Sequence, residues 1–201
     1  MSVDNLRERV TALAGRRCTP ALLCVTGASG VGKTATLDAL RAKLGGRVPT
    51  LLFDSLGVPS EAEMVEGWES GRGWQKAMTW HWVQTAKNVY RTHPLVVIEG
   101  SFDPQYAIAA CTANRVSFAV VLLHTDDHVR RERLTKRGQP DLATDEMCNW
   151  AQYLHESTQQ LGGHVVDASG DVTSVVDSLC AHALPLLGDV PAVDVPKPRR
   201  N

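Results

Sequence analysis

Eight consecutive residues, 27–34 (GASGVGKT), have the types and spacing of a phosphate-binding loop. Triphosphate oxygens need many hydrogen-bond donors at short range, and backbone N–H groups supply them only where no side chain blocks the approach. Glycines at three of these positions relax that restriction. We predict that Lys33 reaches the β- and γ-phosphates and that the Thr34 hydroxyl binds Mg²⁺. The residues expected to hold the nucleotide are Gly27, Ala28, Ser29, Gly30, Val31, Gly32, Lys33 and Thr34.

The sequence on either side supports this interpretation. Residues 21–26 (ALLCVT) form an apolar run typical of a buried strand, and residues 33–44 have apolar side chains at helical spacing. A strand before the loop and a helix after it distinguish a true phosphate loop from a glycine turn that binds nothing. The helix also directs its unpaired N–H groups and positive dipole end at the same anion. The motif does not say what the nucleotide is used for.

Five apolar runs alternate with helical stretches, which is typical of a parallel sheet with helices on both faces. We expect strands at residues 22–26, 50–54, 95–99, 117–124 and 164–167, and helices at residues 6–13, 33–44, 74–91, 145–161 and 172–184. The carboxyl ends of parallel strands meet at one edge, where ligands of such folds bind. Gly27, Asp54 and Glu99 fall at this edge, as does the segment after His124. We predict one α/β domain over residues 1–184 and a Pro-rich, disordered tail over residues 185–201.

Composition excludes some classes of partner. The net charge is −1, from 21 basic and 22 acidic residues, so no overall field favours nucleic acid or an anionic membrane. The five cysteines form no CxxC pair, which fits free thiols in a reducing compartment. The sequence has neither the apolar run of a signal peptide nor one of bilayer-spanning length. We therefore expect a soluble cytoplasmic protein, a monomer or homodimer, that uses neither nucleic acid nor a membrane.

Given these motifs, the chain resembles the small P-loop kinases, the group of P-loop NTPases that includes adenylate kinase, shikimate kinase, gluconate kinase and chloramphenicol phosphotransferase. The resemblance spans residues 21–183 and is most specific at the phosphate loop. It implies a three-layer fold, the use of ATP (or GTP) with Mg²⁺, and transfer of the γ-phosphate to a hydroxyl of a small molecule. The acceptor stays open between a nucleoside, a sugar, an amino-alcohol and an antibiotic-like compound.

Two acidic residues end predicted strands. In related kinases of small alcohols an Asp at the place of Asp54 accepts the proton of the acceptor hydroxyl, so the resemblance implies that Asp54 is a base or orienter. A carboxylate beside the γ-phosphate can serve in this way. Glu99, in the run VVIEG, is expected either to hold Mg²⁺ through water or to contact the acceptor, and both roles stay open. The alternative for both acids is a structural role at the end of a strand.

The resemblance also implies a short lid near residues 126–142. Arg133 and Arg137 are four residues apart and share a helix face. Arg133 is expected against the base and phosphates, and Arg137 at the transferring group, where guanidinium groups suit the spread charge. Arg130 is a weaker candidate, and a solvated charged helix is the alternative. Ser169, after the fifth strand, is expected to border the base through its backbone.

The acceptor site is expected within residues 67–82, which contain four of the five tryptophans. Aromatic walls suit an organic acceptor, and Arg72 is expected to bind an acceptor anion. The alternative places Trp74 and Trp82 in the core and Arg72 in solvent.

Two other functions would use a similar loop. A polynucleotide end kinase needs a basic path for the strand, which the near-neutral charge disfavours. A nucleotide-dependent switch or hydrolase acting on a protein partner needs switch loops and a water-positioning residue, and we locate neither in the sequence.

Overall fold

The computed structural model describes residues 3–188. In this part of the chain, five parallel strands form one sheet in the order β2-β3-β1-β4-β5. The strands are β1 (Ala21–Thr26), β2 (Thr50–Leu52), β3 (Leu95–Gly100), β4 (Phe118–His124) and β5 (His164–Asp167). The predicted five-stranded parallel sheet is confirmed. Strand β2 ends two residues earlier than predicted, because the chain turns there into the 3-10 helix η1 (Phe53–Leu56).

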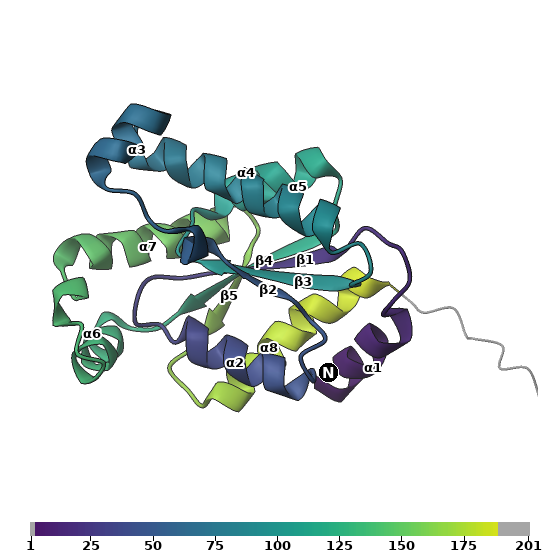
Figure 1. Cartoon of the computed structure of the whole chain (residues 1–201). Helices are drawn as coiled ribbons and strands as arrows, with labels where there is room; N and C mark the ends of the chain where they lie inside the picture. Colours follow the sequence, from purple (N-terminus) through teal and green to yellow (C-terminus); the bar gives the residue numbers. More distant parts are fainter. Residues whose placement is uncertain (1–2, 189–201) are drawn as a thin grey trace, which may run out of the picture.

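Helices cover both faces of the sheet (Figure 1). On one face lie α1 (Val3–Leu13), α2 (Lys33–Lys43) and α8 (Val172–Ala183), and on the other lie α4 (Gly71–Val89) and α5 (Pro104–Asn114). Helix α3 (Glu61–Trp68) packs on α4, while α6 (Asp127–Lys136), the short 3-10 helix η2 (Pro140–Leu142) and α7 (Asp145–Gln160) follow β4. The expected three-layer arrangement is therefore present.

Two helices were not predicted, for different reasons. Helix α5 carries small and apolar residues on all sides (PQYAIAACTAN), so no apolar stripe marks it in the sequence. Helix α3 is short and has no buried side chain, so it too lacks that stripe. A capping box starts it, in which Ser60 and Glu63 satisfy each other's backbone N–H groups.

The central strand β1 separates two apolar cores. All six of its residues are buried, and their side chains alternate between the faces. Leu23 and Val25 belong to the core under α2 and α8, whereas Leu22 and Cys24 belong to the core under α4 and α5. Because β1 lies between β3 and β4, the loop that follows it lies beside the ends of both neighbours.

The predicted tail begins too early. Leu184–Leu187 forms the 3-10 helix η3, whose leucines pack on the core beside α1 and α8. Three leucines in four residues bury enough apolar surface to hold this segment despite Pro185. The rest of the predicted tail, residues 189–201, lies outside the described residues. Across residues 3–188, no helix combines the length and the apolar character needed to span a bilayer.

Candidate active site

A cavity of about 770 Å³ opens at the carboxyl edge of the sheet. Its wall comes from the loop after β1, the start of α2, the ends of β2 and β3, and one face of α6. We call residues 27–34 the phosphate end, and Asp54, Glu99 and Ser101 the acceptor end. The structure brings most of the predicted site residues to this one cavity, namely Ser29, Gly30, Gly32, Lys33, Thr34, Asp54, Glu99, Arg133 and Arg137.

Close contacts explain the glycines of the phosphate end. Gly27 follows β1 directly, and a Cβ there would lie 2.6 Å from the carbonyl oxygen of Leu123 in β4. Gly30 has φ +88°, and a Cβ there would lie 2.9 Å from both the Cγ and the carbonyl oxygen of Arg130. Any larger residue would therefore push the loop away from β4 or α6, and Gly30 also needs the left-handed backbone that glycine tolerates.

Lys33 is the first residue of α2 and turns back over the loop. Its ammonium donates to the carbonyls of Gly27 at 2.7 Å and Ala28 at 3.3 Å. Burial lowers the pKa of Lys33, while the nearby carboxylates of Glu99 and Asp54 oppose this shift. The ammonium thus contacts the loop and interacts electrostatically with both acids of the acceptor end.

The two predicted acids line the same cavity as Lys33, and both interact electrostatically with its ammonium. Burial raises the pKa of Asp54, against the opposing effect of Lys33. Burial also raises the pKa of Glu99, where Lys33 opposes the shift and Asp54 and Asp38 add to it. Asp54 lies in η1 rather than in a strand, because the turn after β2 carries it over the cavity.

Asp38 is a cavity residue that sequence reasoning missed. It lies one helical turn after Thr34 on α2, so the two side chains share a face of that helix. This spacing after the phosphate loop was the available signal. Together with Glu99, these residues offer oxygen atoms, the ligands that Mg²⁺ prefers.

The oxygen donors at the cavity fit the way in which proteins usually bind Mg²⁺ together with a nucleotide. In the described part of the chain, no group of three acidic, His or Cys side chains converges to hold a metal by itself. Mg²⁺ bound in nucleotide sites usually takes one or two protein ligands and completes its shell with phosphate and water. The sparse oxygen donors here suit that arrangement.

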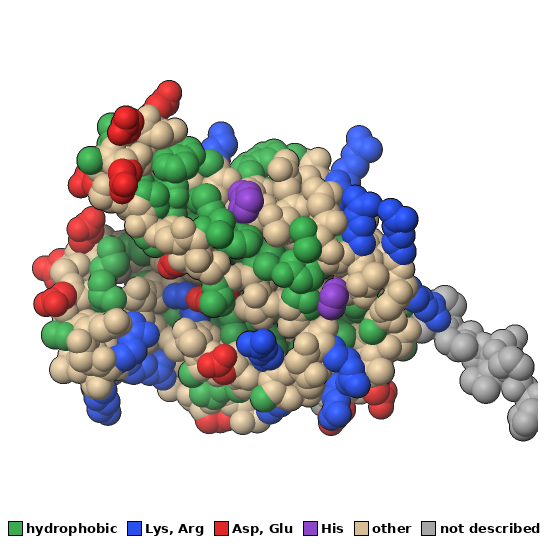
Figure 2. Space-filling view, viewed as in Figure 1, with side chains coloured by type: hydrophobic (Ala, Val, Ile, Leu, Met, Phe, Trp, Pro, Cys, Tyr) green, Lys and Arg blue, Asp and Glu red, His purple; other side chains and the backbone are tan. Residues whose placement is uncertain are grey.

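The two predicted lid arginines lie on α6 and the residue that follows it. In Figure 2, viewed as in Figure 1, Lys and Arg side chains gather over α6. Arg133 donates to the carbonyl of Val31 at 3.0 Å and to that of Ala168 at 2.9 Å, with a longer contact at 3.4 Å to the carbonyl of Ser169. It therefore connects the phosphate loop to the segment after β5. Arg137 caps α6, is exposed and lines the cavity. Ser169 does not line the cavity, but its carbonyl accepts from Arg133, which does.

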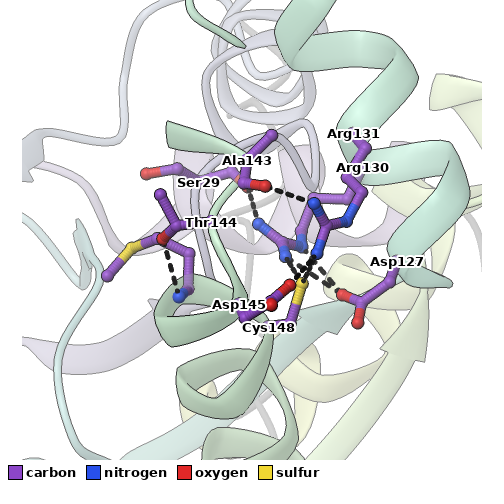
Figure 3. Close-up of polar contacts among 9 residues, drawn as sticks. Ser29, Asp127, Arg130, Arg131, Ala143, Thr144, Asp145 and Cys148 are labelled. Atoms are coloured by element: carbon purple, nitrogen blue, oxygen red, sulfur yellow. Dashed lines mark hydrogen bonds and ion pairs between the residues drawn. The ribbon is translucent and has the colours of Figure 1, made fainter. Parts of the chain in front are cut away.

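Arg130 has a different environment from the other two arginines. Its side chain is completely buried, and it contacts the back of the phosphate loop rather than the cavity. Figure 3 shows it among residues of α6, α7 and the loop, beside Arg131, whose guanidinium reaches Asp145 and the carbonyl of Ala143. The sequence could not distinguish this buried arginine from its exposed neighbours.

The prediction that the tryptophans of residues 67–82 form an aromatic wall of the acceptor site is wrong for two of them. Trp74 and Trp82 are buried in the core under α4, where their apolar area stabilises the fold. Trp74 packs edge-on against Phe53, with ring centroids 5.6 Å apart, and Trp82 donates to the carbonyl of Phe53 at 3.1 Å. Both tryptophans therefore pack against Phe53 of η1 on its core side. Arg72 is exposed on the first turn of α4 and does not line the cavity.

Two aromatic residues of α7 were missed. Trp150 donates from its indole nitrogen to Ser101 Oγ at 2.9 Å, and Ser101 lines the cavity. Trp150 also stacks on Tyr153, whose hydroxyl donates to Asp103 at 2.6 Å. These contacts join α7 to the segment after β3 across almost 50 residues of sequence, and no local motif marks them.

Comparisons with known proteins agree with this geometry. Residues 23–153, more than half of the chain, match the AAA domain family. No curated protein sequence matches the chain significantly. Solved structures with a similar fold include a gluconokinase from Sinorhizobium meliloti 1021, with a TM-score of 0.60, 19% identity, and coverage of 85% of this chain and 95% of that one.

Two further structures extend the comparison. A deoxyadenosine kinase from M. mycoides with bound dATP has a TM-score of 0.54 and 16% identity, and covers 79% of this chain and 97% of its own. A putative kinase from Chloroflexus aurantiacus J-10-fl has a TM-score of 0.50 and 20% identity, over 85% of this chain and 100% of its own. At these identities the likeness establishes the fold, which is that of small P-loop kinases.

Proposed function

Because this chain belongs to the AAA domain family and has the fold of small P-loop kinases, we propose that it transfers the γ-phosphoryl group of ATP to a hydroxyl of a small molecule. The observation that carries the proposal is the position of Lys33. Lys33 lines one cavity together with Asp54 and Glu99, and its ammonium contacts the phosphate end. A polyanion held by the loop and a neutral hydroxyl beside the acids would then meet at this ammonium.

The proposed reaction assigns a role to each group. The acceptor oxygen forms a bond to the γ-phosphorus while the bond from that phosphorus to the β–γ bridging oxygen breaks, so ADP leaves. Asp54 orients the acceptor hydroxyl and takes its proton late in the transfer. Lys33 and Arg137 stabilise the charge on the transferring group and the leaving oxygen, because cations placed where charge develops act most strongly.

Arg133 would contact the base side of the nucleotide, since it already touches the segment after β5. Thr34 and Glu99, with Asp38 nearby, would hold Mg²⁺. The metal ion would neutralise part of the phosphate charge when bound. Glu99 remains open to the second role of contacting the acceptor.

A direct experiment tests the proposal in two steps. Isothermal titration with MgATP and MgGTP measures nucleotide binding, and labelled ATP is then tested against nucleoside, sugar, amino-alcohol and antibiotic pools. We expect MgATP binding, and label transfer to at least one pool that Asp54→Asn slows by about 10²-fold or more. No binding by folded protein would overturn the proposal, as would ATP hydrolysis that no pool accelerates.

A further inference from the structure

Three cationic side chains donate to carbonyls of the phosphate loop. Arg130 donates to the carbonyl of Ser29 at 3.3 Å, Arg133 donates to that of Val31 at 3.0 Å, and Lys33 takes the first two carbonyls of the loop. In a peptide unit the carbonyl and the N–H point in opposite directions. The Ser29 carbonyl, held by Arg130 outside the cavity, therefore favours a Gly30 N–H that faces the cavity, where a phosphate oxygen would accept from it.

Only one of these three cations is outside the cavity. Lys33 and Arg133 line the cavity, so a bound nucleotide competes with the loop for both. Arg130 is completely buried and does not line the cavity, so no phosphate oxygen reaches its guanidinium. The contact from Arg130 to Ser29 is therefore the one that persists when the nucleotide binds.

The guanidinium of Arg130 is held by groups from three elements (Figure 3). Within α6, Asp127 Oδ1 accepts from its Nε at 3.2 Å and from its Nη2 at 3.0 Å. From α7, Cys148 Sγ lies 3.0 Å from the same Nη2, and the loop supplies the Ser29 carbonyl. A buried guanidinium costs free energy unless its donors are paired, and this set of partners meets that need.

The backbone of the phosphate loop and that of α6 are in close contact beside Arg130. Gly30 packs directly on α6, so close that a Cβ would meet both the side chain and the carbonyl of Arg130 at 2.9 Å. The loop is therefore packed against α6 as well as hydrogen-bonded to it. An anchored loop has less conformational freedom to lose when it closes around a ligand, and this difference appears as affinity.

We propose that Arg130 is a positioning residue, which orders the phosphate loop through Ser29 without touching the substrate. The proposal rests on the proposed function in one respect, that the ligand of the loop is a nucleotide. It assigns Arg130 a role distinct from those of Arg133 and Arg137. Loss of Arg130 should weaken the binding of phosphate-bearing nucleotides while the fold and the acceptor end stay intact.

The test compares two neighbouring arginines. Arg130→Met keeps the length and apolar stem of the side chain but removes its hydrogen bonds. Arg131→Met is the matched control, because Arg131 lies on the same helix and also contacts Cys148 at 3.0 Å, yet makes no contact with the loop in the described structure. Isothermal titration with MgATP and MgADP measures affinity, and thermal unfolding without ligand measures the fold.

We expect Arg130→Met to lower the affinity for MgATP and for MgADP by about tenfold, the effect of losing one charge-assisted hydrogen bond. The affinities of Arg131→Met should stay within about twofold of those of the native protein, as for a surface substitution. Equal affinities of Arg130→Met and native protein would overturn the inference and leave the proposed function standing. Failure of the native protein to bind either nucleotide would overturn both.

A second variant covers the case in which Arg130→Met does not fold. Arg130→Lys keeps the charge, but one ammonium cannot reach Ser29, Asp127 and Cys148 together as the planar guanidinium does. Its KM for ATP should rise while kcat at saturating ATP stays near the native value. This split distinguishes a loop that is ordered less well from general damage to the protein, and an unchanged KM would overturn the inference.

Discussion

The two ends of the cavity are built in different ways. The phosphate end comes from eight consecutive residues, the loop after β1 and the first two residues of α2, and it presents mainly backbone. The acceptor end comes from η1 after β2 and from the end of β3 with Ser101 just beyond it, and Ser101 is held by Trp150 of α7. A polyanion can be held by N–H groups that a short glycine-rich segment supplies. A particular organic acceptor needs side chains in a particular arrangement, and only the fold brings these together.

Among the substitutions that test the difference between the two ends, removal of the Lys33 ammonium should have the largest effect on activity. Lys33→Ala should abolish turnover and weaken MgATP binding, because no other lysine among the described residues lines the cavity. Lys43→Ala is a suitable control, since Lys43 ends the same helix and does not line the cavity. ATP consumption with the identified acceptor measures the effect. Substantial turnover by Lys33→Ala would contradict its assigned role.

Asp54→Asn should impair catalysis at the acceptor end without impairing nucleotide binding at the phosphate end. MgATP affinity should stay close to native, while kcat falls by about 10²-fold or more, the usual contribution of a general base. Titration with MgATP and steady-state rates measure the two effects independently. If kcat is retained, Asp54 has only a structural role at the start of η1.

The same carboxylate predicts a pH dependence. Burial raises the pKa of Asp54, and the base must be ionised to take a proton. The rate should therefore be complete above this raised pKa and fall as the pH drops through it, in a range above the ordinary Asp value of about 3.9. A profile of kcat/KM against pH would show this limb. A limb that persists in Asp54→Asn would assign it to Glu99, whose pKa burial also raises.

Two glycine substitutions, one in the phosphate end and one on α3 away from the cavity, test the steric restriction of the loop. Gly30→Ala should weaken MgATP by about tenfold, because φ +88° strains alanine by one to two kcal/mol and its Cβ meets Arg130. Gly67→Ala on α3 meets nothing within 4 Å, so it should leave MgATP affinity unchanged and stabilise the helix slightly. Titration and thermal unfolding of both variants measure these effects. Equal nucleotide affinities would show that the loop tolerates a Cβ.

The smallest expected effect concerns the cap of α3. Ser60→Ala removes the hydroxyl that accepts from Glu63 N–H, at a cost of about 1 kcal/mol in unfolding free energy. Because α3 lies away from the phosphate end, MgATP affinity should not change. Urea unfolding and titration check the two statements. A weakened MgATP affinity would show that α3 is coupled to the phosphate end.

Local patterns predicted most of the fold and the phosphate end. The five strands are apolar runs, and the loop follows the first of them, so neighbouring residues carry each signal. The misplaced end of β2 had no such signal. Phe53 turns away there because its ring packs between Trp74 and Phe102 in the core, contacts that a chain pattern does not contain.

The roles of individual side chains were harder to predict. Trp74 and Trp82 could equally have lined a pocket or filled a core, and burial under α4 decided for the core. Four arginines of α6 and its cap look similar in sequence, yet Arg130 alone among them is completely buried in the described structure. Asp38 has the helical spacing of a site residue, but only its place at the cavity distinguishes it from other exposed acids.

The sequence by itself determined that a parallel α/β sheet carries a phosphate-binding loop at its edge, because strand formation and the wrapping of an anion by backbone depend on neighbouring residues. Only the tertiary structure decided which acids face Lys33, which tryptophans are core, and which arginine lies behind the loop. Those choices depend on contacts such as Arg130 with Ser29, about 100 residues apart, where burial and pairing rather than local propensity set the free energy.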